Sequence, residues 1–344
     1  MFFPFLLAKA PFIKDGGCFC IKRLRCIRKE FRPSIMDGIT NLLTSFTNRN
    51  LGQTPCKRSH AIVPTLAIFI VKGDYPVNNP RNHSIDYTGD LMAIDMHTHI
   101  NHGSSFDVES RVGYSADLDD LILMNRAAGI DKMFACTFAS CLSTEVIVEE
   151  NEYMHQLIDD IDCLCQWVVV EPRIEETFHQ AEQMLQHKKC VGIKLHPPYH
   201  GYSLEAYADK LFSFASRFHA NVLIHPNEFP MGSEKDAAYI VPIANKYPKV
   251  TFIMAHLGNQ TFVDAVQLAV HKNVYIDTSG IASANNLILE YAHKQIGADR
   301  ILFGTDTYSP AFQRGRIEYA MIPRTDKQRI LRDNALWLFV DHLG

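Results

Sequence analysis

From residue 92 onward, short apolar runs alternate with longer segments in which apolar residues recur every three or four positions. The short runs are typical of buried strands and the longer period of amphipathic helices. We predict strands at 92–96, 132–137, 166–171, 190–195, 221–225, 250–255, 273–277 and 300–304. We predict helices at 116–128, 174–187, 203–219, 234–246, 260–272, 284–296 and 325–339. Eight strands alternating with helices indicate an α/β fold, a (β/α)8 or TIM barrel, with an active site at the carboxyl ends of the strands.

The first 91 residues differ in composition from the rest of the chain. They carry 13 Lys and Arg against 6 Asp and Glu, although the whole chain has a net charge of −4. The stretches 48–60 and 73–84 are rich in Asn, Pro and Gly, which is typical of loops or disorder. We therefore expect a poorly ordered N-terminal extension over 1–91 and a barrel domain over 92–344. Because Met92 stands immediately before AIDMHTH, at the start of the first predicted strand, translation from that residue is a further expectation.

Composition narrows the cellular setting and the partners. The apolar run 61–71 has eleven residues and falls short of the ~20 needed to cross a bilayer. Nine scattered cysteines without zinc-finger spacing favour reduced thiols in the cytoplasm, with organelle import as the alternative because 1–32 is rich in Arg. The net charge gives no nucleic-acid footprint, and no glycine-rich phosphate loop is present. We expect a small-molecule substrate, no membrane or nucleic-acid partner, and homo-oligomerisation as an option.

Five polar side chains lie at the carboxyl ends of predicted strands. They are His97, His99, His225, His256 and Asp306. Imidazole nitrogens and a carboxylate oxygen are ligands that divalent metal ions such as zinc accept. The two-residue spacing of the first pair puts both side chains on one face of a strand. A single histidine at the end of a strand is usually structural, but four histidines and one aspartate on the same rim predict a metal-dependent enzyme.

The motifs around these residues resemble those of a known family. In order they are IDMHTH, VGIKLHP, VLIHPN, YPKVTFIMAHLG, NVYIDTSG, DRILFGTDTYSP and KQRILRDNALWLF. Together they resemble the metal-dependent hydrolases of the amidohydrolase superfamily, in detail the amidohydrolase-2 branch. The resemblance implies a distorted (β/α)8 barrel in which His97, His99, His225 and Asp306 hold one divalent ion, commonly Zn²⁺. It also implies that His256 and Asp306 are catalytic and move the protons of a metal-activated water.

Lys194 and His196 leave a second arrangement open. In binuclear members of the superfamily, a lysine on the fourth strand is carboxylated and bridges two metal ions, and Lys194 lies at that position. Lys194 could instead bind an anionic group of the substrate, or form a salt bridge at the rim. The leading prediction is hydrolysis of a C–N or C–O bond in a small amide, cyclic amide, lactone or ester. Decarboxylation by the same family is the alternative, and an inactive binding barrel is a third reading.

Other residues receive weaker assignments. Asp277 and Ser279 follow the seventh predicted strand, and we expect them to support the metal or the base. Arg314 lies in a predicted loop from which it could contact a ligand, but a packing or surface role is the favoured interpretation. Cys136 stands in an apolar segment and is predicted to fill the core.

Overall fold

A computed structural model of the chain describes residues 88–89, 91–102, 118–225, 234–257, 260–280, 285–306 and 309–343. The predicted extension over 1–91 lies outside the described residues apart from 88, 89 and 91. Its predicted disorder and the domain boundary at 92 therefore stay predictions.

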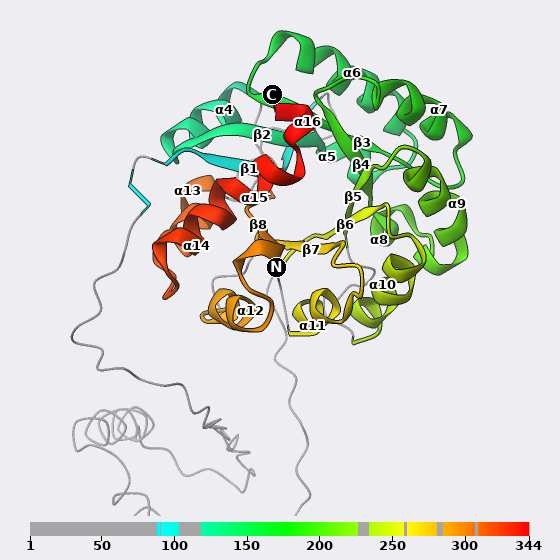
Figure 1. Cartoon of the computed structure of the whole chain (residues 1–344). Helices are drawn as coiled ribbons and strands as arrows, with labels where there is room; N and C mark the ends of the chain where they lie inside the picture. Colours follow the sequence, from blue (N-terminus) through cyan, green and yellow to red (C-terminus); the bar gives the residue numbers. More distant parts are fainter. Residues whose placement is uncertain are drawn as a thin grey trace, which may run out of the picture. The chain divides into compact units, whose positions relative to one another are not determined.

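One parallel sheet follows the order of the chain, with helices around it (Figure 1). The strands are β1 (Ala93–Ile100), β2 (Ile130–Thr137), β3 (Leu164–Val169), β4 (Cys190–Leu195), β5 (Asn221–Ile224), β6 (Thr251–Met254), β7 (Val274–Asp277) and β8 (Ile301–Leu302). Every neighbouring pair from β1–β2 to β7–β8 is parallel. The predicted TIM barrel is confirmed.

The helices occupy the connections between these strands. They are α4 (Leu118–Ala127), α5 (Phe138–Leu142), α6 (Ile147–Asp160), α7 (Glu175–Met184), α8 (Pro197–His200), α9 (Leu204–Arg217), α10 (Glu234–Lys246), α11 (Gln260–Leu268), α12 (Ile288–Ile296), α13 (Pro310–Glu318), α14 (Arg324–Gln328), α15 (Asn334–Leu338) and α16 (Val340–Leu343). Within the described ranges, no helix combines the length and the apolar character of a membrane span.

Some helices differ from the predicted ones. The long helix α6 was not predicted, although Ile147, Met154 and Ile158 are buried at helical spacing on one of its faces. The predicted last helix at 325–339 is divided into α14 and α15 by a π-helical turn over Arg329–Asp333. A π-turn adds a residue to one turn and so changes the direction in which the following apolar face points.

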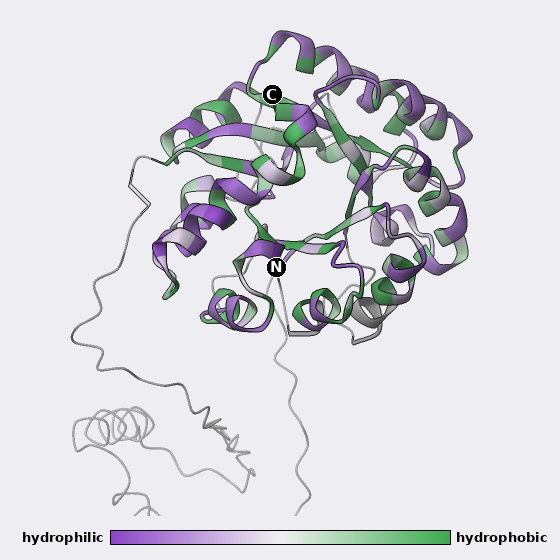
Figure 2. Ribbon diagram, viewed as in Figure 1, coloured by the Kyte–Doolittle hydropathy of each residue, from purple (hydrophilic) through white to green (hydrophobic). Residues whose placement is uncertain are grey.

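Two apolar layers hold the barrel together. One lies between the strands and the surrounding helices, and the other fills the barrel interior. In the interior, Phe339 from the end of α15 contacts Phe134 and Trp167 edge to face, with ring centroids 4.9 and 5.8 Å away. Figure 2 shows apolar residues along the strands and mixed polar and apolar residues on the helices. The barrel is therefore a packed core, which leaves its rim for chemistry.

The first and last strands are joined by main-chain hydrogen bonds. The amide of Met96 donates to the carbonyl of Phe303 over 3.0 Å. The carbonyl of His97 accepts from the amides of both Thr305 and Asp306, over 3.1 and 2.8 Å. This seam closes the barrel and brings the strand that carries the predicted histidine pair against the segment that carries Asp306.

Candidate metal centre

A bulge in β1 aims the histidine pair at the rim. Ile94 and Met96 belong to the inner apolar layer, whereas Ile100 packs in the outer one. Strict alternation would keep all three on one face, so the strand changes parity between them, where its register with β2 shifts. Because of this shift His97 and His99 turn inward, directly after an inward-facing Met96. Bulges of this kind often re-aim side chains beside active sites.

The histidine pair meets Asp306 at one point. The Nε2 atoms of His97 and His99 are 3.2 Å apart. Asp306 Oδ1 lies 3.1 Å from His99 Nε2 and 3.9 Å from His97 Nε2. Ligand atoms that each lie about 2.1 Å from one ion are separated by about 3.0–3.4 Å at octahedral or tetrahedral angles. Two of the three separations lie in this range, whereas the third, 3.9 Å between His97 Nε2 and Asp306 Oδ1, would require a wider angle of about 135° at the ion. The three donors are thus close enough together to hold a single divalent ion.

Asp277 and Ser279 fix the protonation of His97. The Nδ1 atom of His97 lies 2.8 Å from Asp277 Oδ2 and 2.9 Å from Ser279 Oγ. The Ser279 hydroxyl donates to the other oxygen of Asp277, so it can only accept from His97. His97 therefore carries its proton on Nδ1 and presents the lone pair of Nε2 to the centre, as a metal ligand requires. The support predicted for Asp277 and Ser279 matches this geometry.

His256 is held in an unusual backbone conformation beside Asp306. Its φ is 70°, and that of Asp306 is 54°, both in the left-handed region that non-glycine residues rarely adopt. The Nδ1 atom of His256 lies 3.2 Å from the carbonyl oxygen of Ser279, which can only accept, so that nitrogen carries the proton. The Nε2 lone pair of His256 then faces Asp306, with Oδ2 at 3.9 Å.

Burial and neighbouring charges set the ionisation of the acids. Burial alone would raise the pKa of Asp306, but His256, His99 and His97 favour the anion and lower that pKa well below its ordinary value. Burial lowers the pKa of His97 well below its ordinary value, and the nearby Lys194 acts in the same direction. The centre thus combines an anionic carboxylate with a neutral imidazole, which suits a cation between them.

Lys194 reaches the same nitrogen from β4. Its Nζ atom is fully buried and lies 2.8 Å from His97 Nε2. The neighbouring Gly192 has φ 152°, and a Cβ there would approach the carbonyl oxygen of Asn221 to 2.2 Å, so only glycine fits this turn of the strand. Val191, before Gly192, faces the barrel interior, whereas Ile193, after it, faces the helices. Because residues two apart would normally share a face, the strand changes parity at Gly192, and Lys194 therefore turns inward.

His225 and His196 lie next to the centre. The His225 ring is 4.7 Å from that of His256 and stacks on His196 at 4.2 Å between centroids. Among the described residues, some groups of possible metal ligands have donor atoms that all lie within 4.8 Å of one another. One such group consists of His97, His99 and Asp306, and none of them contains His225. His196 also caps α8, where its Nδ1 accepts from the amide of Tyr199. The structure thus brings three of the four predicted ligands together and places the fourth, His225, beside His256.

Two polar residues beneath the centre, Asp95 and Thr305, were not identified from the sequence. Asp95 is fully buried and accepts hydrogen bonds from the amide and hydroxyl of Thr305 and from the amide of His97. Burial raises the pKa of Asp95 to about 7, although these donors favour its anion. Both residues stand inside the quoted motifs IDMHTH and GTDTYSP, so the motifs themselves carried the signal. They tie the ligand-bearing segments of β1 and the residues after β8 together.

Arg314 proves to be structural. Its guanidinium donates to the carbonyls of Leu91, Ala128 and Gly129 and pairs with Glu318 at 3.0 Å. It is largely buried and holds the start of β1 to α13 rather than facing a ligand. Residues 103–117 after β1 and 226–233 after β5 lie outside the described residues.

Solved structures with the same architecture include decarboxylases and a candidate amidohydrolase. A 2,6-dihydroxybenzoate decarboxylase from Rhizobium is 16% identical with a TM-score of 0.59, and the alignment covers 72% of this chain and 98% of that one. A dihydroxybenzoic acid decarboxylase from Polaromonas with bound manganese is 16% identical with a TM-score of 0.56, over 72% and 97%. A candidate amidohydrolase from Staphylococcus aureus is 15% identical with a TM-score of 0.58, over 73% and 100%. At these identities the likeness establishes the fold.

The family follows from the sequence itself. A comparison with curated proteins gave no match. The family Amidohydrolase, in its second branch, matches residues 94–339, which run from β1 to the end of α15 and include every residue of the centre described above. The chain therefore belongs to this amidohydrolase family, as its motifs predicted.

Proposed function

We propose that this chain is a metal-dependent hydrolase that cleaves a C–N or C–O bond of a small amide, cyclic amide, lactone or ester. His97, His99, His225 and Asp306 would hold one divalent ion, most simply Zn²⁺. The observation that carries the proposal is the meeting of His97 Nε2, His99 Nε2 and Asp306 Oδ1 at one point, with the outer nitrogen of His97 fixed by a carboxylate.

The bound ion supplies a Lewis acid, which polarises a substrate oxygen and lowers the pKa of water. The residues do the rest. Asp306, kept anionic by the surrounding histidines, accepts the proton as water attacks the substrate carbonyl. His256 offers an acceptor nitrogen to the same region, because Ser279 fixes its proton on the other nitrogen. The proton held by Asp306 then passes to the leaving nitrogen or oxygen as the C–N or C–O bond breaks.

Lys194 decides between one ion and two. As an ammonium beside His97 it would oppose a second cation, whereas a carboxylated Lys194 would bridge two ions and make His256 a ligand. We propose the single-ion arrangement, in which Lys194 stays an ammonium with Nζ 2.8 Å from His97 Nε2, and His256, with Nε2 3.9 Å from Asp306 Oδ2, serves as the base. We also propose a cytoplasmic enzyme, in which reduced cysteines are stable.

Decarboxylation is the second candidate. It is favoured by the relatives of the same fold that carry this activity, among them the 2,6-dihydroxybenzoate decarboxylase from Rhizobium. The same residues would then hold an aromatic acid by its oxygens and deliver a proton to the carbon that loses CO₂.

Isotopic labelling separates the two reactions. The full chain is incubated in ¹⁸O-water and in D₂O with a panel of small amides, lactones and hydroxybenzoic acids. Hydrolysis places ¹⁸O in the acid product, whereas decarboxylation releases CO₂ and places deuterium on carbon. His97→Ala is the matched negative control, and turnover that survives in it would contradict both candidates.

Metal content tests the number of ions. Elemental analysis is made on the wild type and on Lys194→Met, which keeps the length of the side chain. An equal number of ions per chain in both proteins supports a single ion at the histidine and carboxylate centre. One ion fewer per chain in Lys194→Met than in the wild type would overturn it in favour of a lysine-bridged pair.

A further inference from the structure

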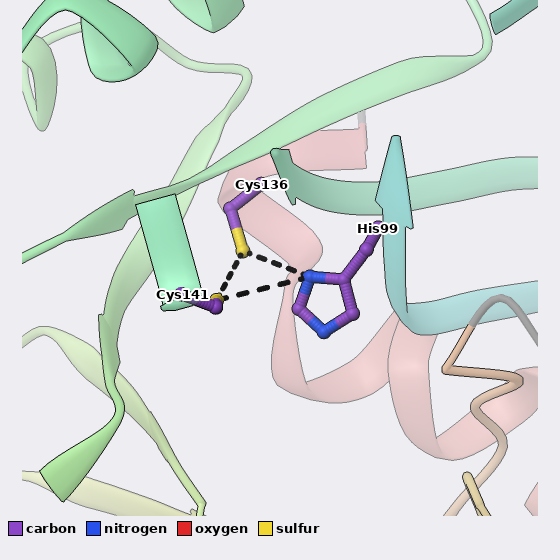
Figure 3. Close-up of side chains that lie close together, drawn as sticks. All are labelled: His99, Cys136 and Cys141. Carbon is purple, nitrogen blue, oxygen red and sulfur yellow. Dashed lines mark hydrogen bonds between the residues drawn. The ribbon is translucent and has the colours of Figure 1, made fainter. Parts of the chain in front are cut away.

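Two buried thiols lie behind the metal-binding edge of His99. Cys136 stands near the end of β2 and Cys141 in α5, and their sulfur atoms point toward the His99 ring (Figure 3). The Sγ atoms are 3.5 Å apart. His99 Nδ1 lies 3.3 Å from Cys136 Sγ and 3.9 Å from Cys141 Sγ. All three side chains are almost fully buried.

His97 and His99 differ in the groups that contact their Nδ1 atoms, the ring nitrogens that face away from Asp306. A metal-bound histidine usually donates its second ring N–H to a carboxylate, a carbonyl or water. His97 follows this rule through Asp277. In the described part of the chain, the partners of His99 Nδ1 are the two cysteine sulfurs instead. The outer side of His99 is thus a cluster of three metal-binding atoms rather than an ordinary support.

The separations fit a tetrahedral ion. With Zn–S near 2.3 Å and Zn–N near 2.1 Å, tetrahedral angles give about 3.8 Å between two sulfurs and about 3.6 Å between sulfur and nitrogen. The observed distances are 3.3 and 3.9 Å between sulfur and nitrogen and 3.5 Å between the two sulfurs, each within about 0.3 Å of these values. The same three donors all lie within 4.8 Å of one another.

We propose that Cys136, Cys141 and Nδ1 of His99 form a second metal site, selective for a thiophilic ion such as Zn²⁺. Two thiolates balance the charge of such an ion, which lets it occupy a buried place. Soft sulfur donors disfavour Mg²⁺ and Mn²⁺, which prefer oxygen, so the two sites would differ in the ions they accept. His99 would bridge them as an imidazolate, with Nε2 toward Asp306 and Nδ1 toward the sulfurs, so that filling both sites releases the ring N–H proton together with the two thiol protons.

Cobalt titration tests the site without reference to catalysis. The reduced full chain, stripped of metal, is titrated with Co²⁺ and followed by absorption. Sulfur ligation produces a thiolate-to-cobalt charge-transfer band in the near ultraviolet, which a centre of histidines and carboxylate cannot produce. We expect the band in the wild type, and its loss together with one equivalent of Co²⁺ in the Cys136→Ser/Cys141→Ser double variant. Cys165→Ser, another buried cysteine of the interior layer, is the matched control and should keep both.

Several outcomes would overturn the proposal. A wild type that takes up Co²⁺ without the band has no thiolate site. A band that persists in the double variant comes from other cysteines of the chain. If the double variant fails to fold, X-ray absorption of the zinc-loaded wild type replaces it, and a spectrum without a sulfur shell near about 2.3 Å refutes the site. The band in His97→Ala separates this inference from the proposed function, because only the first centre requires His97.

Discussion

Gly280 lies against the ring of His256, so that adding one methyl group there should displace this proposed base. Gly280 has φ 62°, and a Cβ built on it would lie 2.8 Å from His256 Nδ1 and 3.4 Å from Asp306 Oδ2. Ordinary contact begins at 3.4 Å, so the His256 ring must withdraw by about 0.6 Å in Gly280→Ala. A misplacement of about 1 Å can reduce a rate by about 100-fold, and we expect kcat to fall by about 10- to 100-fold.

The same variant has a backbone cost that must be separated from the displacement. An L-residue in the left-handed region loses about 1–2 kcal/mol, which corresponds to about 2–8 °C in Tm for a domain of this size. Gly201 provides the matched control because its φ is 68° and no atom lies within 4 Å of its Cβ position. Gly201→Ala should lose similar stability and keep its rate.

The assay compares kcat, Tm and metal content of the two variants on the substrate found by isotopic labelling. Equal rates in Gly280→Ala and Gly201→Ala would refute the inference that catalysis depends on the position of His256. A loss of metal in Gly280→Ala alone would show that the ring acts as a ligand instead.

Three further variants test the support of His97 by Asp277, the catalytic role of His256 and the structural role of Arg314. Asp277→Asn removes the anion that receives the Nδ1 proton of His97, so metal affinity in chelator competition should fall about 10- to 100-fold, and exposed Asp299→Asn should bind as the wild type does. His256→Ala should keep its metal by elemental analysis and lose about 10²- to 10⁴-fold in kcat; a variant without metal contradicts the assignment. Arg314→Met removes the hydrogen bonds to the carbonyls of Leu91, Ala128 and Gly129 and the ion pair with Glu318, and should lower the free energy of unfolding by about 3 kcal/mol in urea titrations, whereas a change in kcat alone would argue against a structural role.

The strands could be predicted because they depend on local pattern, since an apolar run of strand length predicts a buried strand wherever it occurs. The residues proposed as ligands were found because each of them follows or ends such a run. The bulge that turns His97 and His99 inward could not be predicted, since it depends on the register that β1 adopts against β2. The left-handed φ of His256 is likewise set by the surrounding fold and not by local preference.

Cys136 shows how a correct prediction can remain incomplete. It was predicted to fill the core, and it is buried. Its contact with His99 joins two strands and its contact with Cys141 reaches a helix that the pattern did not predict. Proximity of this kind requires the three-dimensional arrangement.

The seam between the first and last strands has a consequence for chain entropy. The proposed ligands on its two sides, His99 and Asp306, are about two hundred residues apart in the chain, and an ion held by both closes a loop of that length. A cross-link across such a loop removes about 5 kcal/mol of conformational freedom from the unfolded state. The ion would thus stabilise the closed barrel by linking the first strand to the segment after the last strand, once that strand has formed. Removing the ion should therefore destabilise the barrel mainly at the seam between β1 and the residues that follow β8.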